Sequence, residues 1–291
     1  MSDGVLLLVA SESHLDHAKA LLVGAKRTGC WQGDFCLLCP KDTNTESIDG
    51  RGIYIALSRF AGWTNRIKHE IFWTEFQNWK RLLYLDLDVL IQRDLNKSVA
   101  ETFQPGKILM EGSQALEGGL GTTILQDWEH FATISGVDEQ TRAAGLARLR
   151  ARHLHVDRPL FASSVMLFNP ADVPDDTVES LLEADAEFAD LNPRGYDQQV
   201  MNLVLYDRMA ALPKAFATWA PFDTISHRVT SEARGWRGDE FPAIVHFWGQ
   251  FAPWIEKAPD TWSYFNNRLG KPCLDVYREN LAAFDETFPR K

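Results

Sequence analysis

Residues 81–91, RLLYLDLDVLI, decide the fold class of this 291-residue chain. The centre of this stretch, residues 82–85, is a continuous apolar run, which is typical of a parallel strand that other layers cover on both faces. Asp86 and Asp88 follow the run directly. Because alternate side chains of a strand point in the same direction, the spacing predicts that both carboxylates face one site at the end of a buried strand.

Strand-like and helix-like segments alternate on both sides of this stretch. The apolar patterns predict strands at residues 5–10, 35–39, 52–57, 164–168 and 243–247. They predict helices at residues 14–27, 64–79 and 126–153 and in the last 35 residues, and a loop at 111–121. This alternation predicts an α/β layered sheet whose ligands bind beyond the carboxyl ends of its strands.

The overall charge restricts the ligands that the protein can bind. The net charge is −10 and the pI is near 5.3, which argues against non-specific binding of nucleic acid because that binding needs a cationic surface. A phosphorylated ligand would therefore require local cations or a bound metal. The longest N-terminal apolar run, residues 5–10, is too short for a secretory signal or a membrane span, which leaves only peripheral membrane contact open.

Four cysteines occur, and two of them form a CxxC pattern. Cys36 and Cys39 lie in the apolar run at residues 35–39, and no second pair exists to complete a four-ligand zinc site. We therefore expect reduced structural cysteines rather than a zinc or redox site, and hence a cytoplasmic location.

The two aspartates allow three interpretations. They can be structural residues that cap a turn, or metal ligands, since hard oxygen ligands suit Mg²⁺ and Mn²⁺. A metal site after an apolar strand would fit a phosphatase of the haloacid dehalogenase type or a sugar-nucleotide transferase. Against the phosphatase, Asp86 lies almost a third of the way along the chain, and Val89 stands where the glycine of that family is usual.

Four separated segments, in this order, resemble the family 8 retaining glycosyltransferases, the group of glycogenin and the bacterial lipopolysaccharide galactosyltransferases. The segments are LLYLDLDVLIQRDL (82–95), LFASSVMLFNP (160–170), YDQQVMNLVL (196–205) and IVHFWGQFAPW (244–254). The resemblance implies a GT-A type, Rossmann-like mixed sheet flanked by helices, with a helical insertion and a helical C-terminal tail. It further implies a transferase domain over residues 1–255 and a helical extension over 256–291 that packs on the same domain.

The resemblance implies that Asp86, Asp88 and His246 hold Mn²⁺, or Mg²⁺, on the diphosphate of a UDP-sugar. An imidazole ligand favours Mn²⁺ over Mg²⁺. The alternative for His246 is a core histidine that is satisfied by a backbone carbonyl.

The remaining site residues also follow from the resemblance. Asp197 and Gln198 match a dipeptide close to the donor sugar and are the expected catalytic residues, and Asp197 also fits the N-cap of a helix over 198–207. Of the upstream basic residues, Lys68 is preferred over Arg66 as the donor contact. The expected contacts to the nucleotide-sugar are Ala10, Ser11, Glu12, Lys68, Asp86, Leu87, Ser163 and Gly249.

The predicted function is transfer of a hexose from a UDP-sugar to a saccharide or glycolipid acceptor, with retention of configuration. Two departures from the family pattern bear on it. Ala252 stands where family members carry a phosphate-binding lysine, and Ala162 replaces an asparagine that contacts the donor sugar. The missing lysine supports one further alternative, a relative that binds a sugar nucleotide or glycan without turning it over.

Overall fold

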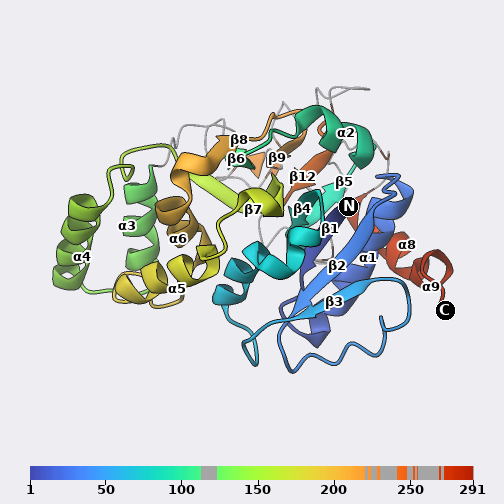
Figure 1. Ribbon diagram of the computed structural model, residues 1–291, viewed down its shortest axis with the longest axis horizontal. Coiled ribbons are helices and arrows are strands. Elements are labelled where there is room, and N and C mark those ends of the chain that lie inside the picture. The colour runs from blue at the N-terminus through green and yellow to red at the C-terminus, as the bar shows by residue number, and fades with distance from the viewer. Residues whose placement is uncertain are drawn as a thin grey trace.

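The computed structural model describes residues 1–112, 123–219, 222–223, 228–229, 241–247 and 272–290, together with Ala252, Trp254 and Leu269. A seven-stranded mixed sheet forms its centre, in the order β3-β2-β1-β4-β7-β6-β8 (Figure 1). The strands are β1 (Asp3–Leu8), β2 (Asp34–Cys39), β3 (Tyr54–Leu57), β4 (Arg81–Leu85), β6 (Ile108–Gly112), β7 (Phe161–Phe168) and β8 (Met209–Ala211).

The direction of the strands changes at the middle of the sheet. Strands β3, β2, β1 and β4 are parallel neighbours, whereas β7 is antiparallel to both β4 and β6. Strand β8 is parallel to β6. The predicted mixed α/β sheet is therefore confirmed.

A second sheet brings distant parts of the chain together. It contains β5 (Val89–Ile91), β9 (Ala217–Trp219) and β12 (Ile244–His246), in the order β5-β12-β9. Strand β12 is antiparallel to β5, and His246 lies opposite Val89. A short hairpin-like pair, β10 (Phe222–Asp223) and β11 (Arg228–Val229), is separate from both sheets.

Helices cover both faces of the large sheet. One face carries α1 (Leu15–Arg27) and α2 (Leu95–Thr102), and the other carries η2 (Asn65–Phe72), η3 (Thr74–Asn78), α5 (Thr177–Glu187) and α6 (Asp197–Val204). The insertion between β6 and β7 contains α3 (Ile124–Ile134) and α4 (Glu139–Arg152), and α4 lies at one end of the molecule (Figure 1). The described residues also form three short 3₁₀ turns: η1 (Glu12–His14), η5 (Pro170–Asp172) and η6 (Tyr206–Arg208).

Two C-terminal helices close the chain against its N-terminal part. Helices α8 (Cys273–Ala282) and α9 (Phe284–Thr287) both contact α1. The ring of Phe288 packs edge-on against Phe35 of β2, and Arg27 pairs with Glu286 at 2.8 Å. The last helices therefore pack directly on the large sheet and on α1.

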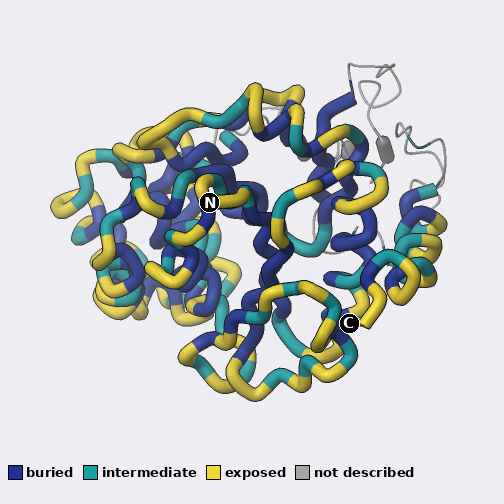
Figure 2. Tube along the Cα trace, turned by 45° about the vertical axis from the view of Figure 1, so that its right-hand side comes forward, coloured by how far each residue is buried: buried dark blue, intermediate teal, exposed yellow. Residues whose placement is uncertain are grey.

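The apolar run of β4 is explained by its two covered faces. Leu82 and Tyr84 belong to the hydrophobic cluster on one face, and Leu83 and Leu85 belong to the cluster on the other. All four side chains are fully buried. Figure 2 shows the burial of the chain as a whole, with buried segments at the centre and most exposed residues toward the outside.

The structure corrects several predicted elements. Residues 81–91 are two strands in different sheets, because the chain bends at residues 86–88 after the last pairing of β4. Residues 64–79 form two 3₁₀ helices rather than one helix, since Trp73 between them has an extended backbone. Residues 126–153 form two helices, separated by a turn in which Gly136 has φ of +78°. Strand β6 was not predicted.

The CxxC pattern lies on β2, and all four cysteines of the chain are free. Cys36 packs in the cluster on one face of the sheet and Cys39 in the cluster on the other. Since the two thiols face opposite sides of a strand, they cannot bind one ion or form a disulfide with each other. Among the helices that the structure describes, none is both long and apolar enough to cross a membrane.

Candidate functional site at the junction of the two sheets

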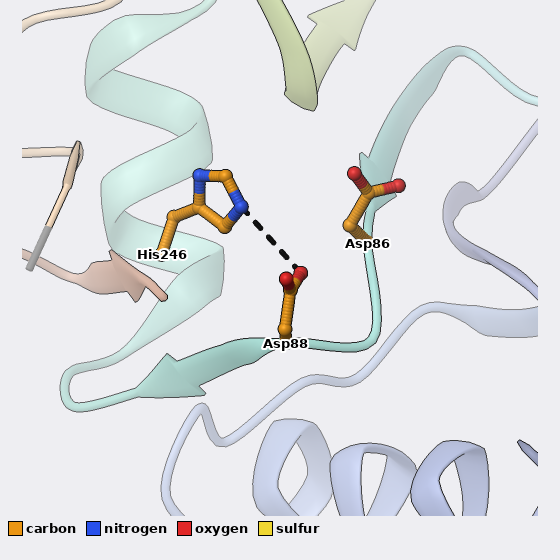
Figure 3. A group of neighbouring side chains, drawn as sticks. All are labelled: Asp86, Asp88 and His246. Atoms are coloured by element: carbon orange, nitrogen blue, oxygen red, sulfur yellow. Dashed lines mark ion pairs between the residues drawn. The ribbon is translucent and has the colours of Figure 1, made fainter. Parts of the chain in front are cut away.

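Three predicted metal ligands converge where the chain passes from the large sheet to the small one. Asp86 and Asp88 lie in the bend between β4 and β5, and His246 ends β12. One ligand atom from each residue lies within 4.8 Å of the others, and His246 Nε2 is 3.5 Å from Asp88 Oδ1 (Figure 3). Two carboxylates and one imidazole form a donor set that suits a divalent cation such as Mn²⁺.

The bend is held by backbone hydrogen bonds to both sheets. The amide of Asp86 donates to the carbonyl of Ser164 on β7, at 2.8 Å. The carbonyl of Asp88 accepts a hydrogen bond from the amide of Phe247, also at 2.8 Å. The two aspartates are therefore presented by a turn that is anchored at both ends, and not by alternation along one strand.

Lys68 on η2 is the predicted cation, and it lies among the carboxylates. Its Nζ is 2.9 Å from the carboxylate of Asp86 and 3.5 Å from Oδ2 of Asp197. Burial by itself would lower the pKa of Lys68, but the negative charges of Asp197 and Asp86 outweigh it and raise that pKa. Arg66 instead pairs with Asp185 at 2.5 Å, so the structure favours Lys68 over Arg66 as a residue of this site.

Opposing electrostatic effects act on the pKa of Asp86. Burial raises its pKa, the ammonium of Lys68 opposes that shift, and the charge of Asp88 adds to it. The hydroxyl of Tyr84 donates a hydrogen bond to Asp86. With three carboxylates around one ammonium, this part of the protein favours an additional cation.

His246 is enclosed by two carboxylates. Its Nδ1 lies 3.3 Å from Oε2 of Glu111, and its other nitrogen faces Asp88. Burial by itself would lower the pKa of His246, but the negative charges of Glu111 and Asp88 beside the ring raise it to about 10. His246 is 4% exposed, and in this buried position a carboxylate lies at each of its two ring nitrogens.

The predicted catalytic residues begin α6. Tyr196 is the N-cap of this helix, so the predicted capping role of Asp197 is wrong. The carboxylate of Asp197 instead accepts a hydrogen bond of 2.6 Å from the hydroxyl of Ser163 on β7. This bond and the contact with Lys68 bring together three of the residues that were predicted to contact the nucleotide-sugar or its reaction centre.

Gln198 and Gln199 contact a buried carboxyl group that was not predicted. Gln199 Nε2 donates to Asp127 Oδ2 on α3, at 2.6 Å. Burial raises the pKa of Asp127 to about 7, although hydrogen bonds from Gln198 and Gln199 oppose the shift. Asp127 is 6% exposed, so its carboxyl group is shielded from solvent.

Replacement of Asp127 by asparagine is expected to stabilise the protein increasingly between pH 4 and 7. The unfolded chain ionises Asp127 near its ordinary pKa of 3.8, whereas the fold holds the proton up to about pH 7, so wild-type stability is lost across this range. The asparagine side chain keeps the shape of aspartate and carries no charge. Relative to wild type, its free energy of unfolding should rise by at most about 4 kcal/mol, since a shift of one pKa unit corresponds to about 1.4 kcal/mol. Urea unfolding of both proteins from pH 4 to 8 measures it; a difference that is independent of pH would contradict the assignment.

A cavity of about 280 Å³ opens at the cluster. It is lined by five residues that were predicted from the sequence, Lys68, Asp86, Leu87, Asp88 and Asp197, and by five that were not, Leu8, His14, Trp63, Asn65 and Trp254. Trp63 is 49% exposed at this cavity, and an indole ring can stack on a sugar or a base. No local periodicity distinguishes this tryptophan from the nine others of the chain.

The predicted nucleoside loop lies beside the cavity. Ala10 and Ser11 are partly buried and Glu12 is exposed, and none of the three lines the cavity. Ser11 Oγ lies 2.8 Å from Nδ1 of His14, which does line it. Gly249, the predicted phosphate contact, lies outside the described residues.

The sequence and the fold both match known glycosyltransferases. Residues 70–258, more than half of the chain, match the family model described as glycosyl transferase family 8. No curated protein matches significantly.

Three solved structures illustrate the structural similarity. The apo bifunctional glycosyltransferase WbbM superposes with a TM-score of 0.59 at 14% identity, over 100% of this chain and 52% of that chain. The galactosyltransferase LgtC, in complex with donor and acceptor sugar analogues, gives 0.56 at 11% identity over 96% and 95%. Apo GlyE of Streptococcus pneumoniae gives 0.59 at 15% identity over 99% and 64%.

The chain thus spans about half of the WbbM chain, under two thirds of GlyE and nearly all of LgtC. These similarities show a GT-A-like fold. Together with the family match over more than half of its length, they establish that the chain belongs to glycosyltransferase family 8.

Proposed function

We propose that this glycosyltransferase moves a hexose from a UDP-sugar to a saccharide or glycolipid acceptor, with retention of configuration and with a divalent metal. The convergence of Asp86, Asp88 and His246 carries the proposal, and the two aspartates also line the cavity. Mn²⁺ is preferred over Mg²⁺ because one of the three ligands is an imidazole. When bound, the metal supplies positive charge that stabilises the departing diphosphate.

The protein's own residues bind and orient the donor. Lys68, whose ammonium group is held by Asp86 and Asp197, is positioned to offset phosphate charge. Asp197 and Gln198 are proposed to contact the donor sugar; Asp197 lines the cavity, and its carboxylate accepts a hydrogen bond from Ser163. Leu87 lines the cavity between the two aspartates. Ala10, Ser11 and Glu12 are proposed to hold the nucleoside, and Gly249 to approach the phosphates.

Two broader predictions accompany the proposal. We propose one transferase domain over residues 1–255 with the C-terminal extension packed on it, supported by the contacts of α8 and α9 with α1. A cytoplasmic location remains a prediction, and the free cysteines are consistent with it. The phosphatase alternative has no support, because the chain belongs to a glycosyltransferase family.

A donor-binding experiment tests the proposal directly. UDP is titrated into the protein by calorimetry with Mn²⁺, with Mg²⁺ and without a divalent metal. We expect binding with Mn²⁺, weaker binding with Mg²⁺ and a loss of at least about tenfold in affinity without metal, since the diphosphate then faces three carboxylates. Absence of UDP binding under all three conditions would contradict the proposed donor class.

One observation favours a second candidate, a relative that binds without turnover. Ala252 is 1% exposed and offers no cation where the family carries lysine. The arginines of α4 do not replace it, because this helix lies at one end of the molecule (Figure 1), where two of its four arginines, Arg148 and Arg152, pair with Asp190 and Glu187. A screen of UDP-glucose, UDP-galactose and related donors for Mn²⁺-dependent hydrolysis separates the two, since a binding protein releases no UDP.

A further inference from the structure

We propose that Glu111 is a positioning residue for His246: its buried carboxylate holds the imidazole at Nδ1 and thereby presents Nε2 to the metal shared with Asp86 and Asp88. The inference rests on the proposed metal site and adds a residue that does not itself touch the metal. Glu111 was not recognised in the sequence, where it follows a three-residue apolar run and precedes Gly112.

The geometry places His246 between two carboxylates that approach its two different nitrogens. Oε2 of Glu111 is 3.3 Å from Nδ1, and Oδ1 of Asp88 is 3.5 Å from Nε2. Glu111 and His246 are 1% and 4% exposed, so water competes little for either group. Figure 3 shows the contact with Asp88, toward which a ring nitrogen of His246 is directed.

The alternation of side chains along β6 places Glu111 on the face of the large sheet that meets the small sheet. Ile108 and Met110 pack in the hydrophobic cluster on one face and Leu109 in the cluster on the other, which also contains Val89 and Ile244. Glu111 follows Met110 and therefore shares the face of Leu109. The pairing register shifts at this point, and the extra residues of the shift lie in β7, since Met110 is opposite Met166 and Glu111 is opposite Ala162.

The chemistry of a metal-bound histidine requires such a partner. A neutral imidazole has one N–H and one lone pair, and only the nitrogen with the lone pair binds a metal. A carboxylate at Nδ1 accepts that N–H, which fixes the tautomer, holds the ring plane and makes Nε2 a stronger ligand. Glu111 is the described carboxylate that lies at Nδ1.

A purely structural role leaves Glu111 unexplained. Neither of its carboxylate oxygens has a hydrogen-bond partner among the described residues. A buried carboxylate is costly unless a neighbouring group compensates its charge, and Nδ1 of His246 at 3.3 Å is placed to do so. A residue that only filled space here would be expected to be apolar. Closing the 3.3 Å separation to a hydrogen bond needs only a small movement of the ring, which binding of a metal at Nε2 would favour.

Binding of Mn²⁺ alone, followed by the loss of its free-ion paramagnetic resonance signal, tests the proposal in the absence of donor. We expect Glu111→Ala to weaken Mn²⁺ binding by about 10- to 100-fold, the usual effect of removing an outer-shell partner. Glu111→Gln should lie between Ala and wild type, because its amide oxygen still accepts the Nδ1 proton but carries no charge. Glu70→Gln is the matched control, since Glu70 is a buried carboxylate that pairs with Arg59 instead.

A second measurement reports the tautomer directly. In the Zn²⁺-loaded protein with ¹⁵N-labelled histidine, His246 of the wild type should show a slowly exchanging, downfield proton on Nδ1. Glu111→Ala should lose that signal or shift it upfield, whereas Glu70→Gln should keep it. A change of fold stability alone would not alter the position of this proton.

The outcomes separate this inference from the proposed function. If wild type binds Mn²⁺ and both Glu111 variants bind it within twofold of wild type, the positioning role is overturned and the metal site stands. If wild type does not bind Mn²⁺, both fail. Should Glu111→Ala not fold, Glu111→Gln decides: weakened binding together with an altered Nδ1 proton supports the proposal, and wild-type values for both overturn it.

Discussion

The Asp88→Ala variant is expected to lose Mn²⁺-dependent binding of UDP and to lose roughly a thousandfold or more in transferase activity. Asp88 supplies one of three ligand atoms that lie within 4.8 Å of one another, and its removal leaves Asp86 and His246 as the remaining pair. A divalent metal contributes several kcal/mol to stabilisation of a leaving diphosphate, and about 1.4 kcal/mol corresponds to a factor of ten. Calorimetry with UDP and Mn²⁺ measures the first effect, and UDP release measures the second.

Stability needs to be followed in the same variant. Removal of the Asp88 carboxylate relieves repulsion on Asp86 but takes a partner from His246. Because these two effects oppose each other, the free energy of unfolding without metal should change little. Glu129→Ala, which removes an exposed carboxylate on α3, is the matched control and should bind as wild type does. If Asp88→Ala retained wild-type affinity for UDP in Mn²⁺, the two aspartates would be structural.

The Lys68→Met variant is expected to lose about 3–5 kcal/mol of stability in the absence of metal, the usual result of removing one partner of a buried ion pair. Lys68 is 6% exposed and touches the carboxylates of Asp86 and Asp197. Methionine keeps the length of the side chain, so the loss reports the charge rather than a cavity. Urea unfolding without divalent metal measures it.

Added Mn²⁺ should recover part of this loss. With the ammonium gone, the metal becomes the remaining cation beside Asp86, so the rise in Tm on adding Mn²⁺ should be larger for Lys68→Met than for wild type. Lys97→Met is the control, because the pair of Lys97 with Glu101 is exposed and contributes less than about 1 kcal/mol. Equal stability of Lys68→Met and wild type would show that Lys68 does not neutralise the carboxylates.

The local pattern of apolar residues was sufficient to predict some elements correctly, among them the buried strand at residues 82–85 and the helix at residues 14–27. The run at residues 82–85 is buried on both sides, as predicted, because its residues alternate between two hydrophobic clusters. The helix expected at residues 14–27 matches α1 to within one residue. Element boundaries failed where a turn interrupted an otherwise continuous pattern, as at Trp73 and Gly136, since periodicity does not register a single extended or left-handed residue.

Asp86 and Asp88 were correctly predicted to converge on one site, but for a wrong reason. Asp86 and Asp88 were expected to share one side of a strand, but they occupy a bend between two sheets. They still converge, because hydrogen bonds to Ser164 and Phe247 hold the bend at both ends. The predicted cap at Asp197 failed because Asp197 is the first residue of the helix and Tyr196 is its N-cap. The carboxylate of Asp197 instead contacts Lys68 and Ser163, which are distant in sequence.

The amino-acid sequence alone determined the α/β class, the position of the two aspartates at the end of a buried strand and, through the order of four segments, the resemblance to glycosyltransferase family 8. These features depend on local periodicity and on the order of motifs along the chain. Only the tertiary structure decided which groups meet. Pairing of β12 with β5 brings His246 to Asp88, and the place of β6 in the large sheet brings Glu111 to within 3.3 Å of His246. Such contacts join residues far apart in the chain, and they form only when non-local strands pair.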